Sequence, residues 1–198
     1  MIPKDNSGID FWFPTSIYYA KNLLSYSENK TMIDEAYRIK SFVPNGGKYW
    51  NCNVYTTFET CQLHTNNKFF MLFEKISQHV HHFSQAHGDD SEYKCVGSWL
   101  NINRKDSFQE EHIHANSIFS VIYYLNAPDG SGKTVFRDSK PPDMFPLKNI
   151  TKRNDVSFET TQYEPEAGKL LVFRSSTPHL VQQGTNDEDR ITISANFA

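Results

Sequence analysis

The sequence is poor in cysteine: it has three, Cys52, Cys61 and Cys95, and no two of them form a C-x-x-C pair. An odd number of widely spaced cysteines excludes a disulfide framework and a cysteine zinc site, and it is typical of reduced thiols. The chain also lacks a run of 18 apolar residues, and no apolar leader follows Met1. We therefore expect a soluble, cytoplasmic protein that does not enter a membrane.

A strong charge of either sign is absent as well. The 20 Lys and Arg residues nearly balance 23 Asp and Glu residues, for a formal net charge of -3, which argues against a nucleic-acid partner. Aromatic residues make up 14% of the chain, and this content excludes an intrinsically disordered protein. At ~150 residues per domain the length predicts one domain, with residues 1–90 as helical support and residues 91–198 as the core.

Two helical patterns precede residue 90. Apolar residues recur at helical spacing over residues 31–43, with Thr31 as the expected N-cap. In residues 67–87 one helix face collects six apolar side chains, namely Phe69, Leu72, Phe73, Ile76, Val80 and Phe83. We expect two amphipathic helices that each bury one face.

The rest of the chain reads as short strands separated by turn residues. The expected strands are residues 94–103, 108–114, 118–126, 133–138, 156–163, 169–174, 179–183 and 190–197. Short strands without intervening helices are typical of a jelly roll, so the predicted fold is mainly β: a double-stranded β-helix with flanking N-terminal α-helices.

Polar and apolar residues alternate along three of these strands, which places the polar set on one face. Asn101 and Asn103 share such a face, as do Arg190, Thr192 and Asn196. Because the apolar face must meet the helices, we expect the polar face to turn inward and to line a cavity. The three asparagines are second candidates for contact with a ligand there.

A possible metal centre comes from three histidines. His112 and His114 are two positions apart on a predicted strand and therefore share a face, and His179 begins a later strand. Neutral imidazoles suit a first-row ion such as Fe(II) and leave coordination positions open.

An anion receptor follows the third histidine in the sequence. Arg190 and Thr192 lie on the same strand face, and a guanidinium with a hydroxyl can hold a carboxylate deep in a cavity. Tyr124, from another inward face, can add a phenolic donor.

Several of these segments together resemble the 2-oxoglutarate/Fe(II)-dependent oxygenases, most of all a small 2OG-Fe(II) oxygenase family with H-x-H before a Tyr-Tyr strand. They are residues 97–103, 112–117, 120–126, 168–173, His179 and residues 190–196, and prolyl-hydroxylase-like proteins share the Tyr-Tyr-Leu-Asn strand. The resemblance implies Fe(II) bound by His112 and His179, with O2 at an open position. It also implies 2-oxoglutarate held by Arg190, Thr192 and Tyr124, and conversion of that cosubstrate to succinate as a protein side chain or small molecule is hydroxylated.

One position departs from the resemblance, because most of the superfamily has Asp or Glu where His114 stands. Either His114 is the third metal ligand, or a carboxylate from Glu110, Glu111 or Asp138 is the third ligand and His114 lies next to the ligands without binding the metal. Two other functions stay open on the sequence, a cupin-type metalloenzyme that does not use 2-oxoglutarate and a jelly-roll binding module without catalysis. The long segment 139–156 is a candidate lid.

Overall fold

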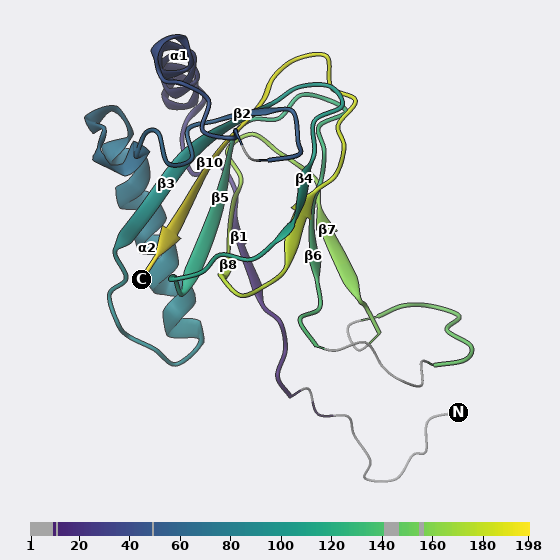
Figure 1. The fold of residues 1–198 in the computed structure, drawn as a ribbon. Helices are drawn as coiled ribbons and strands as arrows, with labels where there is room; N and C mark the ends of the chain where they lie inside the picture. The colour runs from purple at the N-terminus through teal and green to yellow at the C-terminus, as the bar shows by residue number, and fades with distance from the viewer. Residues whose placement is uncertain (1–9, 11, 49, 141–146, 155–156) are drawn as a thin grey trace.

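Two antiparallel sheets face each other in the computed structural model, which describes residues 10, 12–48, 50–140, 147–154 and 157–198 (Figure 1). The larger sheet has the strand order β1 (Ile17–Ala20), β8 (Leu170–Arg174), β5 (Phe119–Asn126), β10 (Arg190–Phe197), β3 (Cys95–Asn103) and β2 (Val54–Thr56). The smaller sheet has the order β4 (Gln109–His112), β9 (His179–Val181), β6 (Thr134–Arg137) and β7 (Thr160–Tyr163). This arrangement confirms the predicted jelly roll.

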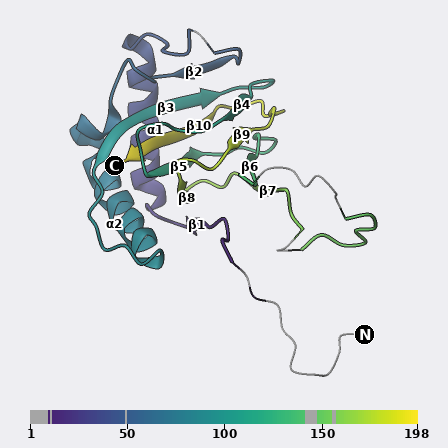
Figure 2. The ribbon, with the colours of Figure 1, turned by 60° about the horizontal axis from the view of Figure 1, so that its bottom comes forward.

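Both helices lie against the outer face of the larger sheet, away from the smaller one (Figures 1 and 2). Helix α2 (Phe70–Ala86) follows two short 3-10 turns, η1 (Leu63–Thr65) and η2 (Asn67–Phe69). All six side chains of the predicted apolar stripe are buried in the core, five of them on α2 and Phe69 in η2, so this expectation is confirmed. No helix of the described residues has the length and apolarity needed to cross a membrane.

Helix α1 (Tyr26–Phe42) begins five residues before the predicted start. Ser25 caps it, because its hydroxyl accepts from the Glu28 amide while the Glu28 carboxylate accepts from the Ser25 amide. This capping box satisfies two amides that the first turn would otherwise leave unpaired. Thr31 is therefore an interior residue, where its hydroxyl donates to the Ser27 carbonyl.

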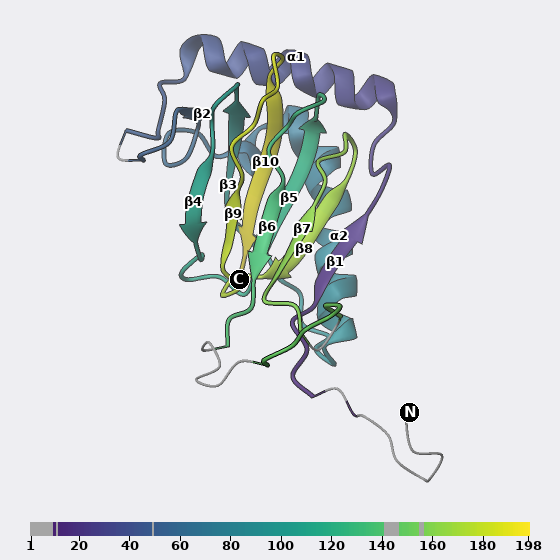
Figure 3. The ribbon, with the colours of Figure 1, turned by 90° about the vertical axis from the view of Figure 1, so that its right-hand side faces the viewer.

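The predicted polar face does turn inward. On β10, Ile191, Ile193 and Ala195 pack in the core beneath the helices, whereas Arg190 and Thr192 line a cavity between the sheets. The register extends this polar layer sideways, since Thr192 is paired with Asn101 of β3 and with Tyr124 of β5. Figure 3 looks at the smaller sheet from its open side, with β10, β5 and β3 behind it.

Some strand boundaries differ from the expected ones, and two strands were not expected. β4 ends at His112, so His114 lies just beyond the strand that was expected to hold both histidines. β1 and β2 have four and three residues, and each pairs with a single neighbour at an edge of the larger sheet. Strands this short are formed by their pairing and carry too little alternation for the sequence to indicate them. The candidate lid falls in part on residues 141–146 and 155–156, which lie outside the described residues.

Candidate functional site

A cavity of about 450 Å³ opens between the two sheets and is lined by residues of both. The larger sheet contributes Asn101, Arg190 and Thr192, and the smaller sheet contributes His112 and His179. The strand pairings therefore bring the predicted polar residues and the predicted histidines to one site.

Three histidines converge in this cavity. Each of His112, His114 and His179 offers a ring nitrogen within 4.8 Å of those of the others. The ring centroids lie 5.2 Å apart for His112 and His114, 4.3 Å for His112 and His179, and 5.0 Å for His114 and His179. No carboxylate of the described residues joins this group.

Each of the three histidine rings makes its hydrogen bond through Nδ1. His112 Nδ1 lies 2.7 Å from the Glu110 carbonyl oxygen, and His179 Nδ1 lies 3.0 Å from that of Thr177. A carbonyl oxygen only accepts, so in the neutral ring each Nδ1 carries the hydrogen and each Nε2 carries the free lone pair. This is the tautomer that a metal ion at Nε2 requires.

The third ring, that of His114, is held by side chains and not by a backbone carbonyl. His114 Nδ1 is 2.5 Å from Asn196 Oδ1 and 3.0 Å from Ser120 Oγ. The Ser120 hydroxyl lies 2.8 Å from that of Ser175, its neighbour in a small hydroxyl cluster. Asn196 was predicted to contact a ligand; it lines the cavity, and its carbonyl holds the His114 ring.

Burial keeps two of the rings neutral. It lowers the pKa of His114 to about 4 and that of His179 to about 3, because desolvation disfavours the charged imidazolium. A proton does not compete for these nitrogens near neutral pH, so their lone pairs are free for a metal ion.

The guanidinium of Arg190 is the second feature of the site. Its residue is 2% exposed, and Nη1 donates to Asn103 Oδ1 at 3.2 Å, while Nε and Nη2 are buried without a partner. Burial lowers the pKa of Arg190, yet an arginine stays charged at any ordinary pH. A buried charge with two idle donors is costly unless an anion binds it.

The aromatic ring of Tyr124 packs against the guanidinium of Arg190. The guanidinium carbon is 5.2 Å from the centroid of the Tyr124 ring, and the phenolic oxygen lies 2.6 Å from Thr134 Oγ1. Tyr124 is not among the residues that line the cavity, although Thr192 beside it is.

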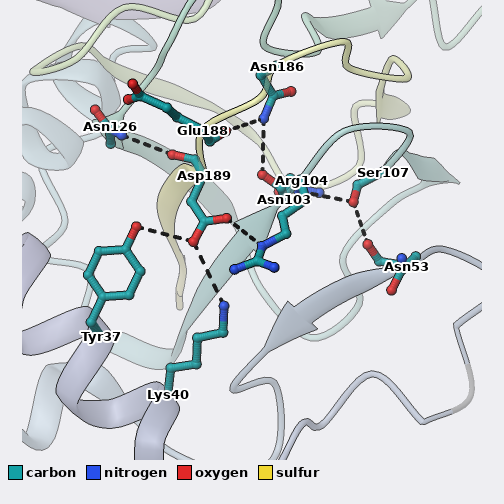
Figure 4. A network of polar contacts seen from close by, with 10 residues as sticks. All are labelled: Tyr37, Lys40, Asn53, Asn103, Arg104, Ser107, Asn126, Asn186, Glu188 and Asp189. Carbon is teal, nitrogen blue, oxygen red and sulfur yellow. Dashed lines mark hydrogen bonds and ion pairs between the residues drawn. The ribbon is translucent and has the colours of Figure 1, made fainter.

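A polar network fixes the loop that leads into Arg190 (Figure 4). The Asp189 carboxylate accepts from Arg104 Nε at 2.8 Å and from the Tyr37 hydroxyl at 3.1 Å, and Lys40 Nζ lies 3.8 Å away. Asp189 has these three partners, and among the described residues it forms no ion pair with its neighbour Arg190. Sequence reasoning did not find this network, because its members are far apart in the chain.

The carboxylates considered as a third ligand have other partners. Glu111 pairs with Arg137 at 2.7 Å, and Glu110 Oε1 accepts from Asn51 Nδ2 at 2.9 Å. Asp138 caps the following turn by accepting from the Lys140 amide at 3.1 Å. The structure thus brings His114, and none of these three acids, to the other two histidines.

Fold and site together define a double-sheet jelly roll whose cavity holds a cluster of three histidines and a buried guanidinium with two unpartnered donors. The family model described as "Putative 2OG-Fe(II) oxygenase" matches residues 97–196, half of the chain. The chain belongs to this family: it is a 2-oxoglutarate-dependent non-haem iron oxygenase, whose cofactor is Fe(II), whose cosubstrate is 2-oxoglutarate and whose oxidant is O2.

Several solved structures have a similar fold. A Pseudomonas putida prolyl-4-hydroxylase is similar with a TM-score of 0.63 and 15% identity, over 92% of each chain. The epimerase SnoN from nogalamycin biosynthesis, solved with Fe3+, alpha ketoglutarate and nogalamycin RO, has a TM-score of 0.66 and 13% identity, over 92% of this chain and 78% of its own. A Trichoplax adhaerens prolyl hydroxylase in complex with a hypoxia inducible factor peptide has a TM-score of 0.59 and 15% identity, over 91% and 82%. A search of curated proteins gave no match.

Proposed function

We propose that this oxygenase hydroxylates a C–H bond of a protein side chain or a small molecule, with the three histidines as iron ligands. The observation that carries the proposal is that one cavity contains both three histidines with free Nε2 lone pairs and a buried guanidinium with two unpartnered N–H donors. One SnoN structure holds a small molecule and the Trichoplax prolyl hydroxylase holds a peptide, so both substrate classes fit this fold. The three free thiols support a reducing, cytoplasmic location.

The metal ligands in this proposal are His112, His114 and His179. Three neutral imidazoles leave the two positive charges of Fe(II) uncompensated. The carboxylate at the keto-acid end of 2-oxoglutarate offsets one of them, and its distal carboxylate is paired with Arg190. When bound, the metal and cosubstrate supply the oxidation by O2, with 2-oxoglutarate converted to succinate and CO2.

Arg190 and Thr192 hold the distal carboxylate of the cosubstrate in this proposal. The Nε and Nη2 groups of Arg190 form a fork that matches two carboxylate oxygens, and the dry surroundings strengthen such charge-assisted bonds. Tyr124 acts through the arginine, because its ring supports the guanidinium and its hydroxyl is already bonded to Thr134. Asn101 and Asn196 complete the polar wall of the cavity.

The remaining contribution of the protein is to position these groups and to exclude water. Buried apolar side chains of the cavity lining, such as Ile122 and Val54, exclude water from the wall that they form. Hydrogen bonds to the Nδ1 atoms fix each imidazole before the metal arrives, so little reorganisation is needed.

Anaerobic titration of the protein with Fe(II) and then 2-oxoglutarate tests the proposal. A visible metal-to-ligand charge-transfer band should appear only when both are present, and it should vanish in Arg190→Ala at the same cosubstrate concentration. A mass gain of one oxygen atom in a candidate substrate then establishes hydroxylation. A band that forms without 2-oxoglutarate, or a substrate oxidised without oxygen gain, contradicts the proposal.

A further inference from the structure

One wall of the cavity is aromatic. Trp50, Phe58 and Trp99 all line it, with ring centroids 5.5 Å apart for Trp50 and Phe58 and 5.2 Å for Phe58 and Trp99. Trp99 in turn lies 5.5 Å from the His114 ring. A continuous row of π-systems therefore leads to the histidine centre, and neither the metal ligands nor the arginine site needs it.

An acidic side chain belongs to the same cavity. Glu110 lines it and is exposed, and its carboxylate accepts a hydrogen bond from the neutral amide of Asn51, the residue next to Trp50. Its neighbour Glu111 is different, because Arg137 balances that charge. Glu110 thus keeps a net negative charge beside the aromatic row.

A third observation concerns hydrogen-bond donors. Asn101 Nδ2 donates to Ser194 Oγ at 3.4 Å, while Asn101 Oδ1 is buried without a partner. This oxygen can only accept, and the dianion of 2-oxoglutarate has only acceptors, so the cosubstrate cannot satisfy it. A water molecule or an N–H group of another occupant of the cavity can donate to it.

We infer that the substrate carries an organic cation, an alkylammonium or guanidinium group, which binds between the aromatic row and Glu110. A cation is attracted by aromatic faces and by a carboxylate, and its N–H groups are donors. The same surroundings disfavour phosphate-rich or carboxylate-rich substrates, because Glu110 repels them. This inference rests on the proposed function, since it names the substrate class of that site.

The test measures binding of small probes to the protein loaded anaerobically with Fe(II) and 2-oxoglutarate. The probes are n-butylammonium, n-butylguanidinium, the neutral butan-1-ol and the anion butyrate, and the dissociation constants are measured by calorimetry. We expect at least one of the two cations to bind about tenfold more tightly than butan-1-ol, and butyrate to bind most weakly. The ratio of the two cations distinguishes a lysine-like from an arginine-like group.

Two variants locate the binding. Glu110→Gln should reduce the preference for the cation over butan-1-ol by about fivefold, whereas Glu92→Gln, which removes an exposed charge from the loop before β3, should leave it unchanged. Trp50→Leu should reduce it too, and Trp50→Phe should restore part of it, because only the aromatic residue attracts a cation.

The result can be separated from that of the proposed function. If the 2-oxoglutarate-dependent visible band forms but the cations bind no better than butan-1-ol, the inference about the substrate is wrong and the oxygenase assignment stands. A cation preference that survives both Glu110→Gln and Trp50→Leu also overturns it. Absence of the band overturns the proposed function itself.

Discussion

His112 of β4 lies directly opposite His179 of β9 in the antiparallel register, with their ring centroids 4.3 Å apart. Side chains directly opposite each other on one face of a strand pair are nearest neighbours. The pairing of these two short strands therefore assembles the histidine pair. His114, two residues past the last residue of β4, adds the third ring from the same chain segment.

Removal of His114 should weaken iron binding to below one ion per chain. His114→Ala loses one of three ligands, while His114→Asp replaces it with a carboxylate that can bind the same ion, so iron content should recover in the second variant. Bound iron is measured after desalting in the absence of oxygen. His81→Ala, which changes a half-buried histidine on α2 outside the cavity, is the control. Full iron content in His114→Ala would remove this residue from the ligand set.

Asn196 should act on the metal through His114. Asn196→Ala removes the acceptor of the Nδ1 hydrogen, and we expect metal affinity to fall by about 10–100-fold. Asn196→Asp supplies a stronger acceptor and should restore or exceed the original affinity, a rescue that a purely structural role does not predict. Metal titration monitored by Co(II) absorption measures both.

The control for that pair is Ser194→Ala. Ser194 lines the same cavity on the same strand, but its hydroxyl contacts Asn101 and no histidine. Its metal affinity should stay that of the original protein. An equal loss in Ser194→Ala and Asn196→Ala would show that the cavity as a whole, and not the His114 hydrogen bond, sets the affinity.

Arg190 should control the cosubstrate and not the metal. Loss of hydrogen bonds to a charged group costs about 1.5–3 kcal/mol, so Arg190→Ala should weaken 2-oxoglutarate binding by about 10–150-fold. Arg190→Lys keeps the charge but loses the fork and should recover only part of the affinity. Titration of the visible band measures this, with Lys30→Ala on the outer face of α1 as the charge control. Unchanged 2-oxoglutarate affinity in Arg190→Ala would place the distal carboxylate elsewhere.

The metal-free protein should lose stability as the pH falls below about 6.5. The unfolded chain protonates its histidines near that pH, whereas burial lowers the folded pKa of His114 to about 4 and that of His179 to about 3. Between these values the unfolded state binds more protons, so the free energy of unfolding decreases on acidification, by roughly 2–3 kcal/mol between pH 6.5 and 5. Above pH 7 both states are neutral at these positions and the effect is absent.

Urea unfolding at a series of pH values measures this dependence. A double variant, His114→Gln with His179→Gln, cannot take up these protons and should show a flatter profile over the same range. If both proteins lose stability equally, then other groups are responsible for the acid sensitivity.

Periodic patterns in the sequence predicted the parts of the fold that depend on local spacing. The stripe on α2 and the alternation on β10 were visible because side-chain direction follows directly from position in a helix or strand. The apolar pattern predicts a start of α1 at Thr31, which is wrong. The helix begins earlier because the polar side chains of Ser25 and Glu28 form a capping box, and an apolar pattern does not include polar residues. β1 and β2 were missed because three or four residues carry too little pattern.

The sequence by itself determined which chemistry the chain can support: imidazoles at alternate positions, a later histidine, and an arginine on an inward strand face. Only the tertiary structure decided how these groups are used. Pairing of β4 with β9 brings distant histidines into contact, the carbonyls and Asn196 select the Nε2 lone pairs, and burial leaves the Arg190 donors without a partner. The reason is that residue type and spacing act along the chain, whereas register, desolvation and hydrogen-bond partners arise between segments that meet only on folding.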